Sequence, residues 1–203
     1  MFTETVQGDH TTTGTATEPH ALTLLRRACN RGYAIEPQRT GGAVIRWRRI
    51  SLATHRPVLR SITLTPQVPA DPTDCDLANL RVIASVPVVR LVDSERFTLP
   101  VIEAGTYVIP PSQGERLLSQ GFLLNSRDEH LRLTLSAHLA LVAHKHQTMN
   151  SSDCTTAWCS CGLAVHCKNA EQAEARRNAH LAAVGADFVQ SLDAAFTAAV
   201  ASV

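Results

Sequence analysis

The sequence lacks any run of about 18 or more apolar residues, so it offers no candidate for a membrane-spanning helix. Its first segment, MFTETVQGDHTTTGTATEP, also lacks the basic stretch followed by an apolar stretch that marks a secretory signal. Cysteines are few: there are six in 203 residues, and four of them fall between positions 154 and 167. We therefore expect a cytoplasmic protein without a membrane partner. In the reducing cytosol its clustered thiols are expected to bind a metal rather than form disulfides.

Acidic residues are nearly missing from residues 21–65, although the formal net charge of the whole chain is only +1. This region holds one acid, Glu36, and nine arginines, at positions 26, 27, 31, 39, 46, 48, 49, 56 and 60. Clustered arginine is typical of phosphate binding, because released counterions drive association with nucleic acid. We take Arg46, Arg48, Arg49 and Arg60 as candidate residues for binding DNA or RNA. The alternative is a solvated sheet face whose charge is balanced by Asp71, Asp74 and Asp76.

The hydrophobic pattern predicts a mixed α+β fold made of several small parts. Residues 1–19 are Thr-rich and almost free of large apolar groups, which predicts a disordered tail. The remaining parts are a basic α-β-β-β unit over 20–66, a proline-rich linker over 67–76, a middle α/β domain over 77–143, and a zinc-binding helical module over 144–203.

In the basic unit, apolar residues at helical spacing around Leu22, Leu25 and Cys29 predict a helix that ends at Gly32. Three alternating segments follow and predict strands near Ile35 and over 43–52 and 57–66. The order of elements and the pattern GY…GG…RW…LTP resemble the fold of bacterial mRNA-cleaving toxins, which is similar to double-stranded-RNA-binding domains. The catalytic His of that family would follow the Gly pair, where this chain has Ala43, so the resemblance implies the fold and not the cleavage.

The middle domain begins with apolar, proline-interrupted runs that read as strands and continues with a helix over about 112–120. Gly121 is expected to end that helix, a hairpin of strands over 122–125 and 131–135 follows, and Ser136 is expected to cap the next helix. This helix, hairpin and helix resemble the recognition helix and wing of winged-helix regulators. That resemblance implies DNA binding, with Arg127 at the tip of the wing.

The C-terminal part predicts a helix that Asn169 caps and Gly185 interrupts. A last helix then carries an apolar stripe through Phe188, Leu192 and Phe196. Such a stripe must dock on another surface, so this helix is a candidate for contact with a host protein or with a second copy of the chain.

Cys159 and Cys161, in the sequence Cys-Ser-Cys-Gly, can supply two thiolates from one tight turn. Zinc needs four such ligands, and we expect His180 and His146 to complete the set from the flanking helices; His144 or Cys154 is the alternative to His146. A zinc ion held this way would join elements that have little core of their own. The motif W-x-C-x-C-G followed by a helix with His resembles small uncharacterised proteins of actinobacteriophages and their hosts, although Trp158 is one residue off that pattern. The resemblance covers about 45 residues and implies a structural zinc module.

Signatures of zinc hydrolases are missing: there is no H-E-x-x-H, and no H-x-E followed by C-x-x-C. Glu171 or Glu174 could be offered as a general base beside a catalytic zinc, but neither lies in such a signature. We therefore expect a non-enzymatic zinc protein of phage or actinobacterial type that is nucleic-acid-associated or regulatory. The alternative is a protein–protein adaptor or oligomerising factor that uses the zinc for structure.

Overall fold

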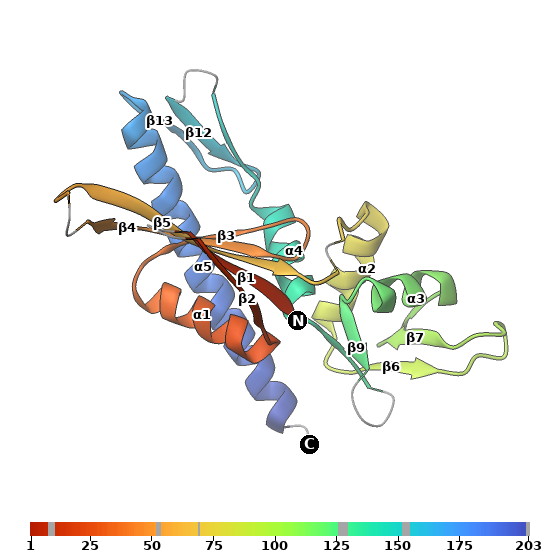
Figure 1. Ribbon diagram of the computed structural model, residues 1–203. Coiled ribbons are helices and arrows are strands. Elements are labelled where there is room, and N and C mark those ends of the chain that lie inside the picture. The colour runs from red at the N-terminus through yellow and green to blue at the C-terminus, as the bar shows by residue number, and fades with distance from the viewer. Residues whose placement is uncertain (8–10, 52–53, 69, 126–129, 152–154, 202–203) are drawn as a thin grey trace.

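The computed structural model describes residues 1–201, with the exception of 8–10, 52–53, 69, 126–129 and 152–154. Helices and strands both contribute throughout this part of the chain, so the predicted α+β class is confirmed. Figure 1 shows the layout: an N-terminal sheet with α1 and α5, a second group of elements around α2 and α3, and α4 between them.

The N-terminal sheet has five antiparallel strands in the order β2-β1-β5-β4-β3. Its strands are β1 (Phe2–Gln7), β2 (Thr12–Ala16), β3 (Ala34–Pro37), β4 (Ala43–Ile50) and β5 (Pro57–Pro66). The prediction of a disordered tail over 1–19 is therefore wrong. Pairing with β5 satisfies the backbone hydrogen-bonding groups of β1, and β-branched threonines suit strands. The buried side chains of Phe2 and Ala16 add apolar contacts.

Helix α1 (Glu18–Asn30) lies against one face of this sheet, as predicted. Thr17 caps its first turn, Pro19 occupies a position that needs no donor, and Gly32 follows with a left-handed φ of 64°. The buried side of α1 consists of Ala21, Leu22, Leu25 and Ala28.

The second group of elements runs from residue 74 to residue 145. It contains α2 (Asp74–Ser85), β6 (Val89–Val92), β7 (Val101–Ala104), β8 (Tyr107–Ile109), α3 (Pro111–Ser119), β9 (Leu123–Asn125), β10 (Leu131–Leu133) and α4 (Leu135–Lys145). The predicted order of helix, hairpin and helix after residue 110 is confirmed, and Gly121 follows α3 with a φ of 71°. The tip of the hairpin, including Arg127, lies outside the described residues.

Two local predictions in this region are wrong. Residues 74–85, predicted as linker and strand, form α2, because a capping box between Thr73 and Asp76 starts a helix there. The cap of α4 is Thr134, whose hydroxyl accepts from Ala137, and Ser136 lies inside the first turn. The first error concerns the type of element, and the second concerns which polar residue caps a helix.

Helix α5 (Ala170–Ala201) is one continuous helix, so the predicted interruption at Gly185 is also wrong. Gly185 lies where α5 crosses β3, and a Cβ atom there would be 2.8 Å from the Cβ of Ile35. The glycine therefore permits close packing of helix and strand. Figure 1 shows the first half of α5 beside β12 and the second half beside α1.

Two apolar cores hold these elements, and α4 contributes to both. Leu135 and Leu139 of α4 pack in the core with the N-terminal sheet, α1 and α5, whereas Ala137 and Ala140 pack in the core with α2, α3 and β6–β10. Glu18 of α1 adds a polar tie, because its carboxylate accepts from the backbone N–H of Leu135. The N-terminal sheet and the C-terminal helix thus share one core, although they are far apart in the sequence.

None of the described helices combines the length and apolarity that crossing a membrane requires.

Candidate metal centre and basic surface

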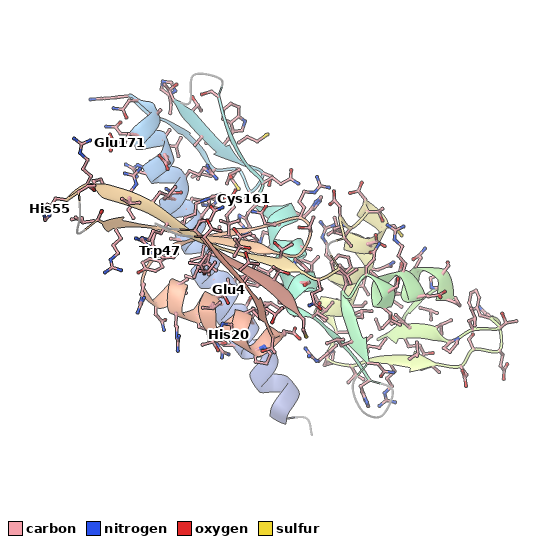
Figure 2. All side chains as sticks on the ribbon, viewed as in Figure 1. Glu4, His20, Trp47, His55, Cys161 and Glu171 are labelled. Carbon is pink, nitrogen blue, oxygen red and sulfur yellow. The ribbon has the colours of Figure 1, made fainter. Side chains whose placement is uncertain are left out.

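A small antiparallel sheet carries the two cysteines of the Cys-Ser-Cys-Gly motif. It has the order β11-β12-β13, with β11 (Thr148–Asn150), β12 (Thr156–Cys159) and β13 (Ala164–His166). The turn between β12 and β13 is closed by backbone hydrogen bonds from Cys159 to Leu163 and from Gly162 to Cys159. Gly162 has a φ of 100°, a conformation that favours glycine. Cys159 and Cys161 therefore project from one tight turn, and Figure 2 shows Cys161 at the end of the hairpin nearest α4.

Two histidines from flanking helices reach the same point. His146 caps the C-terminal end of α4, and His180 lies in the first half of α5. The ligand atoms of His146, Cys159, Cys161 and His180 all lie within 4.8 Å of one another. These four residues are positioned to hold a metal ion.

Two sulfur–nitrogen distances are close to the edge of a coordination tetrahedron. Cys159 Sγ lies 3.8 Å from His146 Nδ1, and Cys161 Sγ lies 3.6 Å from His180 Nε2. With Zn–S of about 2.3 Å and Zn–N of about 2.0 Å, a tetrahedral ion separates sulfur and nitrogen by about 3.5 Å. Little movement would be needed for all four atoms to bind one ion.

Ser160 holds the cysteine turn against the end of α4. Its hydroxyl donates to the carbonyl of Lys145 and accepts from the backbone N–H of Gln147, both at 2.8 Å. Its own N–H donates to the carbonyl of Gln147 at 2.9 Å. Lys145 and Gln147, on either side of His146, are thereby fixed to Ser160, which lies between the two cysteines. Hydrogen bonds of this kind orient the residues that hold a metal ion.

The protein environment keeps two ligands uncharged when no metal is bound. Burial raises the pKa of the Cys159 thiol, and interactions with Cys161 and Ser160 modify this effect. Burial also lowers the pKa of His146, helped by His180 and Lys145 and opposed by Asp187. The imidazole of His146 is thus ready to bind at neutral pH, whereas a metal must displace the thiol proton of Cys159.

The structure brings together all four ligands predicted from the sequence and leaves out the nearby candidates it describes. His144 is not part of the group, and the ring of His166 instead bonds the hydroxyl of Thr156 at 2.8 Å. Cys167 is partly buried and lies outside the group as well. Cys154, the other candidate, falls outside the described residues.

The predicted arginine-rich face is divided between both faces of the sheet. In the β4–β5 register Arg46 is opposite Ser61 and Arg48 opposite Leu59, whereas Arg60 is opposite Trp47. Side chains alternate along a strand, so Arg46 and Arg48 lie on one face and Arg49 and Arg60 on the other. The four candidate arginines of β4 and β5 therefore lie on two different faces of the sheet.

Two of the predicted arginines also have acidic partners. Arg46 forms an ion pair with Glu36, which Arg177 of α5 contacts at 3.1 Å, and Arg48 lies 3.4 Å from Glu174 of α5. These partners come from β3 and α5, and not from Asp71, Asp74 or Asp76. Asp71 pairs at 3.3 Å with Arg39, another arginine of residues 21–65, and Asp76 pairs at 2.7 Å with Arg116 of α3.

The end of β4 from Trp47 and the start of β5 as far as Arg60 form a projecting basic pair of strands, which we call the ribbon together with the described residues between them, 51 and 54–56. Among the described strands, β1 follows β5 only as far as Ser61 and β3 follows β4 only as far as Arg46, so the ribbon extends past its neighbours. It carries Arg48, Arg49, Arg56 and Arg60 and no acidic residue. Figure 1 shows it extending away from the body of the molecule, and Figure 2 shows His55 at its tip.

A groove of about 660 Å³ lies at the base of the ribbon, between α1 and the sheet. We call it the arginine groove; its lining residues are Leu24, Arg27, Ala28, Arg31, Tyr33, Ile45, Trp47, Arg48, Arg49 and Ile62. The rings of Tyr33 and Trp47 are stacked, with centroids 5.3 Å apart and planes 10° apart. Arg27 and Arg31 were not among the site residues predicted from the sequence. Their spacing of four residues, on one side of an amphipathic helix, was the available signal.

Comparison with protein-family models, with curated proteins and with solved structures gives no match. The resemblances to phage zinc proteins, to winged-helix regulators and to mRNA-cleaving toxins therefore stay predictions.

Proposed function

We propose that this chain is a non-enzymatic nucleic-acid-binding protein whose C-terminal module is held by a structural zinc ion. The observation that carries the nucleic-acid part is the ribbon, which presents four arginines and no acid beside a groove rimmed by more arginine. A two-stranded ribbon fits the major groove of a duplex, and arginines in a concave surface bind the backbone of a single strand.

Zinc is the metal that best fits the ligand set. Two thiolates and two imidazoles in a tetrahedral arrangement are a ligand set that favours zinc over magnesium or calcium, which require oxygen. All four positions would be filled by the protein, so no position remains for water or substrate. This closed arrangement supports a structural role.

Several arginines of the basic surface are available for phosphate. In the described part of the chain, no carboxylate lies within ion-pair distance of Arg27, Arg31, Arg49 or Arg56. The pair between Arg48 and Glu174 is exposed and long, so phosphate could displace it at small cost. By contrast, Arg46 is held between β3 and α5 and serves the fold.

The test is salt-dependent binding of fluorescently labelled oligonucleotides, measured by anisotropy with single-stranded and duplex probes. Replacing Arg27, Arg31 and Arg49 together by Ser should weaken binding strongly and flatten the salt dependence by about 0.7–0.9 per lost phosphate contact. The matched control replaces Arg81, Arg90 and Arg96, which are exposed arginines outside the ribbon and groove, and removes the same charge. Equal losses in both triple variants, or no binding at low salt, would contradict the proposal.

An adaptor function is the second candidate, and one observation favours it. Met149 and Trp158 face each other across β11 and β12 and are 58% and 38% exposed. Phe188 and Leu192, predicted to offer an apolar stripe to a partner, instead pack in the core of the same chain. Light scattering of the wild type and of a Met149→Ser, Trp158→Ser variant tests this function. An oligomer in the wild type that is lost in the variant would favour it.

A further inference from the structure

We infer that the arginine groove receives unpaired bases of a single-stranded polynucleotide, with Trp47 as the stacking surface. This inference rests on the proposed function and deepens it, because it specifies which nucleic acid the groove takes. It follows from three properties of the groove: its apolar floor, its charged rim and its pair of stacked rings.

The floor and the rim suit different parts of a nucleotide. Apolar side chains of α1 and the sheet form the floor, namely Leu24, Ala28, Ile45 and Ile62. Arginines stand on both sides, with Arg27 and Arg31 from α1 and Arg48 and Arg49 from β4. No acidic residue is among those that line the groove in the described part of the chain. A ligand with a flat apolar part and an anionic backbone is complementary to this arrangement.

The two aromatic rings give the floor a specific shape. Tyr33 directly precedes β3, whose first residue pairs with Arg46, so its ring lies beside that of Trp47. Both rings line the groove, and they are almost parallel. A base can extend such a stack irrespective of its identity, because every base has a π-face. The expected binding is therefore tolerant of sequence.

The groove distinguishes a single strand from a duplex. Its volume of about 660 Å³ lies in the range of sites that enclose small ligands, which is about 300–1,000 Å³, so it can hold one or two nucleotides. A duplex keeps its bases stacked on one another and offers phosphates to a concave surface. A single strand can turn a base inward. Only the single strand uses both the floor and the rim.

The experiment uses Trp47 as its own reporter. The chain has two tryptophans, so the Trp158→Phe variant leaves Trp47 as the one that emits. This protein is titrated with 15-nucleotide oligothymidylate, with oligouridylate of the same length, and with a 15-base-pair duplex. Saturable quenching by the single strands, without quenching by the duplex, is the expected result. Comparison of the DNA and RNA strands shows which sugar the groove prefers.

Variants of Trp47 measure the stacking contribution. Trp47→Leu should weaken single-strand binding about tenfold, which is typical of the loss of one stacked base, while Trp47→Phe should retain most of it. Trp158→Leu is the matched control on the distant hairpin and should bind like the wild type. Thermal unfolding of each variant shows whether it folds. If Trp47→Leu does not fold, the quenching titration of the Trp158→Phe protein and the affinity of Trp47→Phe still test the inference.

The possible failures are distinguishable. Binding of single strands without Trp47 quenching, or duplex binding as tight as single-strand binding, would overturn this inference and leave the proposed function standing. No binding of any oligonucleotide would overturn both. Equally tight binding of polyglutamate would assign the groove to acidic protein segments and would also overturn the inference.

Discussion

The two halves of α5 are held by different kinds of interaction. In the second half, Phe188, Val189 and Leu192 are buried in the core with α1 and the N-terminal sheet, and Asp193 adds an ion pair with Arg26. In the first half the buried apolar side chains are Ala173, Leu181 and Val184, and none of them belongs to that core. Polar contacts predominate there: His180 belongs to the candidate metal centre, and Glu174 and Arg177 pair with residues of the sheet. The second half is thus attached mainly by apolar packing, and the first half mainly by polar contacts.

This difference indicates what a metal ion at the candidate centre would contribute. The sheet β11-β12-β13 buries only Ala157 and Cys159 among the side chains that the structure describes. So little buried apolar surface cannot offset the entropy of ordering a three-stranded sheet. A metal ion that joins this sheet to α4 and α5 can supply the missing free energy. The second half of α5 has no such need.

Removal of the metal should have the largest effect on the difference between the two halves of α5. Structural zinc contributes on the order of 10 kcal/mol in small modules, so a strong chelator should unfold residues 147–167 and loosen the first half of α5. Hydrogen exchange read by mass spectrometry should show rapid exchange there and unchanged protection in β1, β4 and β5. Protection of β12 and β13 that survives chelation would contradict this expectation.

In the second half of α5, truncation of a buried side chain should strongly lower the free energy of unfolding. Phe188 is 4% exposed in the core, so Phe188→Ala should lower the free energy of unfolding by about 3–5 kcal/mol in urea titrations. Trp158→Ala removes an aromatic side chain from the exposed hairpin and should cost much less. Similar losses in the two variants would mean that the two regions do not differ as described.

The variant Gly185→Ala tests how closely α5 packs on β3 at the point between its two halves. Helix propensity alone would stabilise this variant by about 1 kcal/mol, but the added methyl would meet Ile35 at 2.8 Å, and overpacking costs about 1–3 kcal/mol. We therefore expect net destabilisation. Gly14→Ala is the matched control, since no atom lies within 4 Å of the added group. A more stable Gly185→Ala protein would show that α5 does not cross β3 this closely.

Acidification should lower the free energy of unfolding through His138 of α4. Burial lowers the pKa of His138, Glu18 opposes this effect and Arg132 adds to it. Below about pH 6.5 the unfolded chain binds a proton that the folded chain resists, so the free energy of unfolding falls as the pH drops through this range, by less than about 1.4 kcal/mol per pH unit.

Urea titrations at pH 7 and pH 5.5 measure this effect at fixed zinc concentration, so that protonation of the metal ligands affects each variant equally. His138→Gln should reduce the loss on acidification, whereas His55→Gln, at the exposed tip of the ribbon, should not. An unchanged pH dependence in His138→Gln would exclude this histidine as the source.

The sequence predicted the metal centre better than the architecture around it. Ligand chemistry is local: a Cys-Ser-Cys-Gly turn and a histidine nineteen residues later constrain the site directly, and the choice of His146 needed only the idea of flanking helices. The strands β1 and β2 were missed because β1 is stabilised by pairing with the distant strand β5 and β2 by pairing with β1, and not by their own composition. Gly185 was misread for a similar reason, since the partner that requires it is Ile35.

The basic surface, which comprises the ribbon and the arginine groove, was predicted only in part. The charge excess in residues 21–65 was visible in the sequence, but the pairing of Arg48 with Glu174 was not, because Glu174 lies on the distant helix α5. Nor was the contribution of Arg27 and Arg31, which depends on how α1 packs over the sheet. Patterns within one element were predictable, and contacts between distant elements needed the structure.

The most direct test of the central claim is native mass spectrometry of the zinc-loaded protein and of single variants at each ligand. The wild type and Cys167→Ser, which alters a nearby cysteine outside the group, should each carry one zinc ion per chain. His146→Ala, Cys159→Ser, Cys161→Ser and His180→Ala should each lose it. A wild-type chain without zinc, or a Cys159→Ser chain that keeps it while Cys154→Ser or Cys167→Ser loses it, would contradict the account.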